Sequence, residues 1–383
     1  MNTRDLLFEL IRNRVCGGSL TVKKEDLTGE DLAELFSLAK MHDITYIVSS
    51  ALIENKLIDK HDEKYKDFIS QQHLSVYRYE NNDFVLGLLI NLFEENGVDF
   101  IPMKGSVVKK LYPEPCMRMS CDIDLLIKEE DLERATKVLI EKANAIKTTT
   151  HRYEHSFDLA ANVHLELHFK LTDEGDGIQE VLDRIWQDAK DKDGYSHYKL
   201  MSNETFYAYH FIHMASHFKS GGCGIRPFLD LWIMERNMPI DKEKLNAILE
   251  TCRLTAFVKA AFKVSKVWFD GEKKDELTDN IEDYILRSGV YGNTENRVAV
   301  STEKQGCFKY VWGRLFIPYS SLVNRYPSLE GKRWLTPVYC VRRWGRMLFR
   351  KRSKRAIAEL KLSMNISPEV AEQTRKLLDD LKI

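Results

Sequence analysis

The sequence has no Cys-x-x-C pair, no long apolar run and almost no net charge. Its seven cysteines are scattered and odd in number, which argues against a disulfide framework and against a cysteine-based zinc site. No apolar run approaches the roughly 18 residues that a membrane-spanning helix needs. The N-terminal segment has the pattern of an amphipathic helix and not of a signal peptide. We therefore expect a protein of the reducing cytoplasm with no transmembrane segment.

Positive and negative charges are nearly balanced. The 383 residues carry 57 Lys and Arg against 58 Asp and Glu, a net charge of −1, which does not point to a nucleic-acid or membrane partner. The distribution is uneven, because residues 301–355 hold 14 basic and 2 acidic side chains, a local charge of +12. The rest of the chain must then carry −13, so the C-terminal region is electrostatically distinct.

Helical periodicity dominates the chain outside one short segment. Apolar side chains recur at helical spacing before residue 98 and again after residue 176. Between these stretches, strand-like runs alternate with two helices, one after Ser106 and one at 129–142, in the order of a small α/β unit. We predict an α+β fold with a small mixed-sheet core between helical segments. The expected divisions are a helical region at 1–97, the core at 98–175, a helical region at 176–300 and a basic region at 301–383.

Two acids stand in an otherwise apolar strand, Asp122–Ile127. Side chains alternate between the faces of a strand, so Asp122 and Asp124 project to one side. Two neighbouring carboxylates repel each other and are costly to bury. A divalent cation such as Mg²⁺ removes this cost, because it prefers oxygen ligands and usually keeps substrate phosphates in its shell. We also expect Asp124→Asn to leave the stability of the metal-free protein unchanged or higher, since it relieves this repulsion.

A phosphate-binding segment is predicted just before the acid pair. Lys104, Gly105 and Ser106 follow a short strand and precede a predicted helix, where free backbone N–H groups favour phosphate. Gly105 allows close backbone approach, Ser106 adds a hydroxyl, and Lys104 adds a positive charge. A phosphate cradle followed by a carboxylate pair is typical of metal-dependent phosphoryl or nucleotidyl transfer.

A third acid lies in a later strand, where His164, Glu166 and His168 share one face. If this strand lies beside the strand of Asp122 and Asp124, Glu166 completes a carboxylate triad. The same three residues also have the composition of a transition-metal site with two histidines and one carboxylate. Both interpretations stay open at this stage.

These motifs resemble the nucleotidyltransferase superfamily of DNA polymerase beta and the kanamycin nucleotidyltransferases. The shared pattern is Gly-Ser, then about fifteen residues, then Asp-x-Asp and a later strand acid. A larger set of motifs, spread over most of residues 30–340, is similar to a poorly characterised bacterial nucleotidyltransferase-like family. The residues that carry this resemblance are Lys104-Gly105, Tyr112-Pro113, Arg118, Asp122–Leu126, Glu166–His168, His217, Arg226 and Asp230-Leu231.

The resemblance implies a nucleotidyltransferase core that moves a nucleoside monophosphate, AMP from ATP, to an acceptor hydroxyl or phosphate. Two Mg²⁺ ions, or Mn²⁺ in their place, would be held by Asp122, Asp124 and Glu166, with Glu166 also a candidate general base. The triphosphate would be bound by Lys104, Gly105, Ser106 and Arg118. The candidate acceptor pocket consists of His164, His168, His217, Arg226 and Asp230. The acceptor itself is open: a small molecule, a peptide, a protein or RNA.

Simpler interpretations apply to several of these residues. Arg118 equally suits an ion pair with an Asp, and Arg226 and Asp230 stand four apart on a helix, where they could pair with each other. His210, His213 and His217 share a helix face, but a zinc protease is excluded because no Glu follows His213.

The basic segment at 341–355 holds 8 basic residues in 15. A solvated helix is its default interpretation, and contact with RNA or an anionic membrane is the alternative. We expect it to flank the cleft and help recruit the nucleotide. Two rival functions also remain, an inactive nucleotidyltransferase-like scaffold and an RNA-binding or RNA-modifying protein that uses the basic region.

Overall fold

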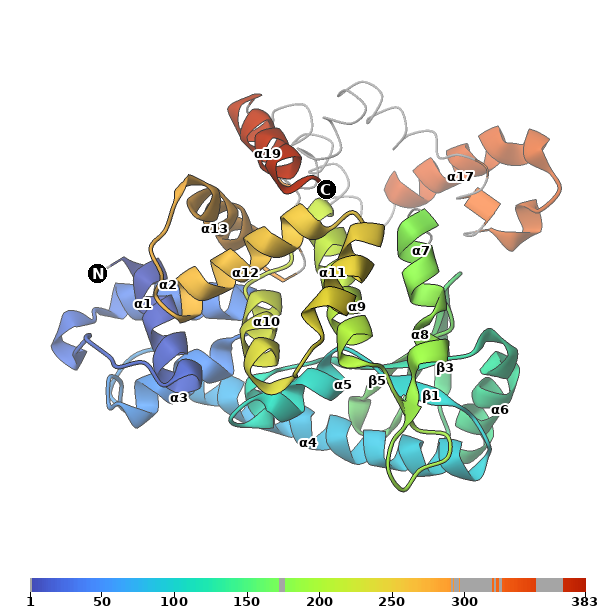
Figure 1. Cartoon of the computed structure of the whole chain (residues 1–383), viewed down its shortest axis with the longest axis horizontal. Helices are drawn as coiled ribbons and strands as arrows, with labels where there is room; N and C mark the ends of the chain where they lie inside the picture. The colour runs from blue at the N-terminus through green and yellow to red at the C-terminus, as the bar shows by residue number, and fades with distance from the viewer. Residues whose placement is uncertain are drawn as a thin grey trace. The chain divides into compact units, whose positions relative to one another are not determined.

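The computed structural model describes residues 2–171, 176–290, 292, 296, 319, 322–323, 326–348 and 368–383. The chain divides into two compact units, and Figure 1 labels their helices and strands. The first contains Met1–Met214 and Ile225–Asp279, and the second contains Ala215–Gly224 and Asn280–Ile383. Helices surround one mixed sheet in the first unit, so the predicted α+β fold is confirmed. The predicted division into four regions is not tested by these units and stays a prediction.

The N-terminal part of the first unit is helical, as predicted. It contains α1 (Thr3–Ile11), a π-helical turn (Arg12–Cys16), α2 (Gly29–Met41), α3 (Thr45–Glu54) and the long α4 (Tyr65–Glu95). Helix α2 begins with a capping box, in which Thr28 and Asp31 bond each other's backbone N–H groups. Helix α4 ends before Gly97, whose φ of 65° is the left-handed conformation that glycine adopts without strain.

A five-stranded sheet follows α4, in the order β1-β2-β5-β4-β3. Its strands are β1 (Phe100–Pro102), β2 (Asp122–Ile127), β3 (Ile146–Thr150), β4 (Glu154–Asp158) and β5 (His164–His168). Strands β2 and β5 are parallel, and the other neighbours are antiparallel. Because β2 and β5 are adjacent, the two strands that carry the predicted acids lie side by side.

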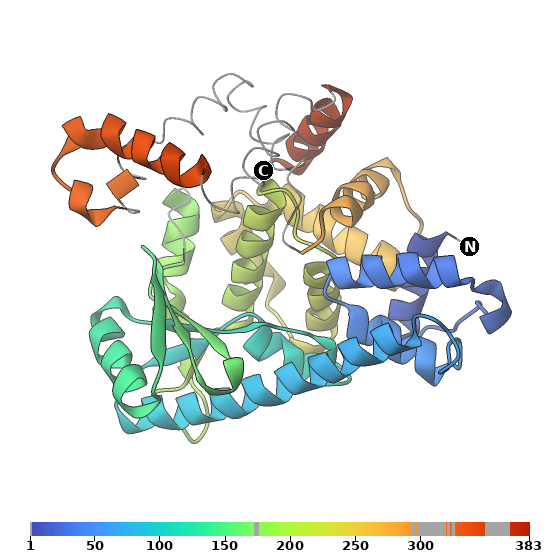
Figure 2. The ribbon, with the colours of Figure 1, turned by 180° about the vertical axis from the view of Figure 1, so that it is seen from behind.

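The two faces of the sheet differ in character. Ile123 and Leu125 of β2 and Leu165 and Leu167 of β5 are buried in one apolar core, together with residues of α4 and of α6 (Leu132–Lys142). Helix α4 runs along this side of the sheet (Figure 2). The alternation of a strand then places the polar residues of β2, β5 and β4 on the opposite face. These residues are Asp122, Asp124, His164, Glu166, His168, Glu154, Ser156 and Asp158.

The connection from β1 to β2 differs from the prediction. The helix expected after Ser106 is only one turn, α5 (Gly105–Val108), and the 3₁₀ turns Lys109–Leu111 and Pro115–Met117 follow it. Tyr112 precedes a proline and is extended, with φ −71° and ψ 152°. The residue before a proline is disfavoured in the helical conformation, which explains why helical structure does not continue beyond Leu111.

The remainder of the first unit is helical with one small two-stranded sheet. Its elements are α7 (Asp176–Asp183), α8 (Ile185–Asp188), β6 (Lys190–Asp191), β7 (Lys199–Leu200), α9 (Asn203–Lys219), which continues into the second unit, α10 (Arg226–Asn237), α11 (Lys242–Thr251) and α12 (Thr255–Phe269). Helices α11 and α12 are close in sequence but separate. Arg253 lies between them with a φ of 56°, which a continuing helix does not allow.

The second unit contains α13 (Glu276–Ser288), whose first turn belongs to the first unit, two 3₁₀ turns (Pro327–Leu329 and Arg333–Leu335), α17 (Thr336–Leu348) and α19 (Pro368–Leu381). Leu322, Leu329 and Cys340 form a small buried cluster. Residues 349–355 of the basic segment lie outside the described residues, so its expected place beside the cleft stays a prediction. Among the helices that the structure describes, none has both the length and the apolar character needed to cross a bilayer.

The glycine at position 105 is packed too closely to accept a side chain. A Cβ built on Gly105 would lie 2.4 Å from Nη1 of Arg118, which cannot easily move because its guanidinium is tied to Asp230. We predict that Gly105→Ala lowers the free energy of unfolding by about 1–3 kcal/mol, the usual cost of overpacking. Urea denaturation measures it. The control is Gly87→Ala in α4, where no atom lies within 4 Å and stability should be equal or higher. Equal stability of Gly105→Ala and the unmodified protein would contradict this packing.

Candidate active site

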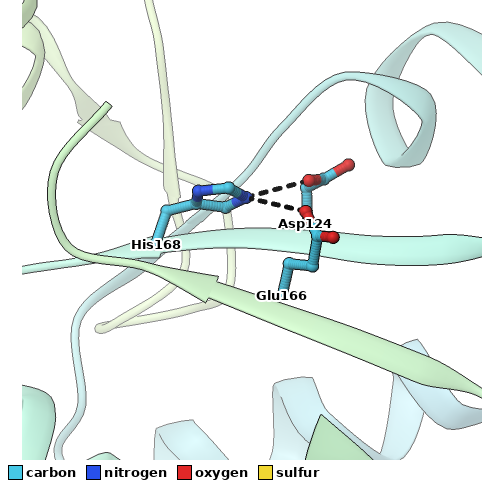
Figure 3. Close-up of side chains that lie close together, drawn as sticks. All are labelled: Asp124, Glu166 and His168. Atoms are coloured by element: carbon cyan, nitrogen blue, oxygen red, sulfur yellow. Dashed lines mark hydrogen bonds and ion pairs between the residues drawn. The ribbon is translucent and has the colours of Figure 1, made fainter. Parts of the chain in front are cut away.

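The polar face of the sheet carries a compact cluster of Asp124, Glu166 and His168 (Figure 3). Asp124 of β2 is in register with Glu166 of β5, and His168 follows two residues later on the same face. One ligand atom from each residue lies within 4.8 Å of the others. Nε2 of His168 is 3.0 Å from Oδ1 of Asp124 and 3.4 Å from Oε2 of Glu166. The two carboxylates therefore converge on one ring nitrogen.

Asp124 is the most deeply buried member, with 3% of its surface exposed. The ammonium of Lys104 donates to the same Oδ1 atom that faces His168, at 2.7 Å. Burial alone would raise the pKa of Asp124, but the positive charge of Lys104 and the contact with His168 hold that pKa well below its usual range. Asp124 is therefore a carboxylate at neutral pH, compensated by two basic side chains.

His168 lies between carboxylates on both of its ring nitrogens. Nδ1 is 3.2 Å from Oε2 of Glu154, while Nε2 faces Asp124 and Glu166. Burial alone would lower the pKa of His168, but the hydrogen bonds with Asp124 and Glu166 outweigh it and raise the pKa to about 9. The imidazole is thus protonated in the metal-free protein and acts as an internal cation of the cluster.

Asp122 has less compensation than Asp124. It is half-buried, and its carboxylate accepts a hydrogen bond from the hydroxyl of Ser120 at 2.8 Å. Burial raises the pKa of Asp122, and the negative charges of Asp124 and Glu166 raise it further. The Asp-x-Asp motif alone does not show this difference in charge compensation between Asp122 and Asp124.

The predicted phosphate-binding segment lies next to Asp122. Gly105, Ser106 and Asp122 line a small pocket together with Lys109 and Ser120. The backbone N–H of Ser106 donates to the carbonyl of Met103 at 3.1 Å, so it is engaged within the loop. The following helix is a single turn, and the phosphate-binding role of this segment stays a prediction.

Arg118 and Asp230 are bound to each other. Nε and Nη2 of Arg118 donate to the two carboxylate oxygens of Asp230, both at 2.7 Å, and the hydroxyl of Tyr112 donates to the same carboxylate. The side chains of Arg118 and Asp230 are only 8% and 2% exposed. The interpretation of Arg118 as the partner of an Asp is therefore confirmed, and the roles of both residues towards nucleotide and acceptor stay predictions.

Arg226 does not pair with Asp230, so that interpretation was wrong. It lies 3.6 Å from the carboxylate of Asp43 and donates to the carbonyl of Met119. The bidentate geometry of Arg118 takes both oxygens of Asp230 instead. Asp43 and Arg118 lie far from helix α10 in sequence, so no local spacing rule identifies either pair.

The histidines that the sequence singled out lie in different parts of the structure. His164 has its Nδ1 atom 2.8 Å from Asp158 at the exposed end of β5. Among the described residues, the one group with metal-ligand geometry contains His168 and two carboxylates, not His164. His210 is packed in the interior, with Nε2 against the carbonyl of Pro227. His217 belongs to the second unit, and its place in an acceptor pocket stays a prediction.

Sequence reasoning missed two neighbours of the cluster. Glu154 lies on the polar face of β4, which alternation in that strand indicates, but its pairing with His168 depends on strand register, which no local pattern gives. Tyr209 of α9 is buried, which raises its pKa, and the charges of Asp124 and Glu166 raise that pKa further while Lys104 lowers it. No local pattern connects Tyr209 to residues of the sheet.

Comparison with known families gives one match. The model of a family described as uncharacterised nucleotidyltransferase matches residues 28–270. This match includes the whole sheet and the cluster, and it ends before the basic region, short of the expected residue 340. Comparisons with curated proteins and with solved structures returned no match.

The two acids of β2 should respond in opposite ways to the loss of charge. Asp124→Asn removes the anion that Lys104 and His168 share, so we predict that it lowers the free energy of unfolding by about 3 kcal/mol. The earlier expectation of unchanged stability is thereby reversed. Asp122→Asn removes a like charge and should leave stability equal or higher.

Urea denaturation in EDTA at pH 7 measures both variants. This pH is suitable because a lowered carboxyl pKa stabilises above the ordinary value near 4 and loses its effect only as the pH falls. An equal loss of stability in Asp124→Asn and Asp122→Asn would contradict the assignment of Lys104 and His168 to Asp124.

The raised pKa of His168 predicts a pH-dependent stability. Its contribution is complete below the ordinary histidine pKa, near 6.5, and is lost as the pH rises through about 9. Over that range the metal-free protein should lose about 3 kcal/mol more than His168→Gln, at about 1.4 kcal/mol for each pH unit. NMR titration of the ring gives the pKa directly. A midpoint near 6.5 would show that the carboxylates do not hold the proton.

Proposed function

Because the chain belongs to the family described as uncharacterised nucleotidyltransferases, we propose that it transfers a nucleoside monophosphate, AMP from ATP, to an acceptor hydroxyl or phosphate. The observation that carries this proposal is the convergence of Asp124 and Glu166 from two parallel neighbouring strands. Asp122 lies on the same face of β2. This arrangement supports nucleotidyl transfer in general, and the choice of ATP rests on the resemblance.

The donor chemistry of the cluster fits divalent ions. Carboxylate oxygens are the ligands that Mg²⁺ and Mn²⁺ accept. Burial raises the pKa of Asp122, and the carboxylates of Asp124 and Glu166 raise it further, so a bound cation would stabilise the ionised form of Asp122. Asp122, Asp124 and Glu166 would hold such ions. Bound there, they would neutralise the triphosphate and make the acceptor hydroxyl more acidic.

The side chains around the cluster suit the remaining tasks. In the reaction, an acceptor oxygen bonds to the α-phosphorus, the bond between the α- and β-phosphates breaks, and pyrophosphate leaves. The carboxylate of Glu166 is a quarter exposed and would take the proton of the acceptor hydroxyl. Lys104, Ser106 and Gly105 would bind the β- and γ-phosphates, and His164 at the exposed end of β5 would line the acceptor pocket.

The direct test is the fate of the phosphate atoms of ATP. We expect label from α-³²P-ATP, and not from γ-³²P-ATP, to appear in an acceptor when the protein is incubated with Mg²⁺ or Mn²⁺ and fractionated small molecules, peptides or RNA. Asp122→Asn should reduce transfer by at least about 100-fold, within the range that a catalytic group contributes. Asp191→Asn, an exposed acid of β6, is the control and should retain it.

Two outcomes would contradict the proposal. Transfer of label from the γ-position would identify a phosphoryl transferase instead. Failure of the unmodified protein to bind ATP in the presence of either ion, measured by calorimetry, would favour the inactive scaffold.

A further inference from the structure

The cluster contains a nitrogen donor that a pure magnesium site does not need. His168 is 7% exposed, and its Nε2 atom points between the carboxylates of Asp124 and Glu166 (Figure 3). We infer that Asp124, Glu166 and His168 form a binding site for Mn²⁺ in preference to Mg²⁺, with Nε2 of His168 as a direct ligand and Glu154 as its positioning residue. This inference rests on the proposed function in taking the cluster as that reaction's metal site.

The distances within the cluster suit neighbouring ligands of one ion. Ligands about 2.1–2.2 Å from an octahedral ion are about 3.0 Å apart along an edge of the octahedron. Nε2 of His168 lies 3.0 Å from the Asp124 oxygen and 3.4 Å from the Glu166 oxygen. One ligand atom from each residue lies within 4.8 Å of the others. One ion can therefore bind between these three atoms with small movements of the side chains.

Glu154 gives the imidazole the support that metal-bound histidines have in proteins. A ligating histidine usually donates its other ring N–H to a carboxylate, which fixes the tautomer and the ring orientation. Nδ1 of His168 lies 3.2 Å from Oε2 of Glu154, and the two residues are in register across β4 and β5. This contact directs the lone pair of a neutral imidazole at Nε2 towards Asp124 and Glu166.

The mixed donor set decides between the two ions. Mg²⁺ prefers oxygen ligands and gives up its water reluctantly, whereas imidazole suits transition metals. Mn²⁺ accepts carboxylates and phosphate oxygens as Mg²⁺ does, and as a transition metal it also accepts nitrogen. Two carboxylates with one imidazole therefore favour Mn²⁺. Lys104 shares Oδ1 of Asp124, and an ion bound there would require its ammonium to give up that contact.

The first test looks for nitrogen bound to the ion. Mn²⁺ is added to the full-length metal-free protein, and electron spin-echo modulation detects ¹⁴N coupled to the ion. We expect nitrogen modulation in the unmodified protein, its loss in His168→Gln and its retention in His164→Gln, the matched histidine on the same face of β5. Absence of nitrogen modulation on bound Mn²⁺ in the unmodified protein overturns the inference, even if no variant folds.

The second test measures selectivity. Free Mn²⁺ is followed by its electron paramagnetic resonance signal while Mg²⁺ competes for the site. We expect Glu154→Gln to weaken Mn²⁺ binding by about 10–100-fold, the usual effect of losing such a supporting carboxylate. His168→Gln should reduce the ratio of Mn²⁺ to Mg²⁺ affinity. An unchanged ratio in His168→Gln overturns the inference.

These measurements separate the inference from the proposed function. Nitrogen coupling without transfer of α-label would support the Mn²⁺ site and contradict the proposed nucleotidyl transfer. Transfer of α-label without nitrogen coupling would support nucleotidyl transfer and contradict the Mn²⁺ site.

Discussion

The site depends on the compensation of one buried carboxylate. Asp124 is almost fully enclosed, and an isolated anion in that position would be strongly destabilising. Lys104 and His168 both contact its Oδ1 atom, at 2.7 and 3.0 Å. These two contacts allow an acid-rich sheet face to exist without a bound ion. They also hold together Asp124, Glu166 and His168, the residues that we propose as metal ligands, and such preorganisation is what binding sites generally favour.

The architecture of the sheet makes this compensation available. Parallel pairing of β2 and β5 places Asp124 directly beside Glu166 and brings His168 to the same edge. Antiparallel pairing of β4 then adds Glu154 behind the imidazole. The apolar halves of the same strands are buried against α4 and α6, and this packing sets their register, because a shift of one residue would turn every polar side chain into the core.

Local patterns were enough to predict the strands but not the partners of their side chains. The limits of β2 and the shared face of Asp122 and Asp124 follow from a period of two. Two partnerships could not be predicted in this way. Arg118 meets Asp230 across 112 residues of sequence, and Glu154 meets His168 only through strand register. The prediction for Asp124→Asn changes for the same reason, since repulsion between adjacent acids is visible in the motif and the cations Lys104 and His168 that contact Asp124 are not.

The central claim is that the convergent acids of β2 and β5 bind the reacting phosphate through a metal ion. The most direct measurement is a crystal structure of the full-length protein with Mn²⁺ and α,β-methylene-ATP, which cannot release pyrophosphate. The account predicts an ion held by Asp124 and Glu166 in contact with the α-phosphate, and the β- and γ-phosphates beside Gly105 and Ser106. A nucleotide bound away from this face of the sheet, or bound there with both acids still occupied by Lys104 and His168, would contradict it.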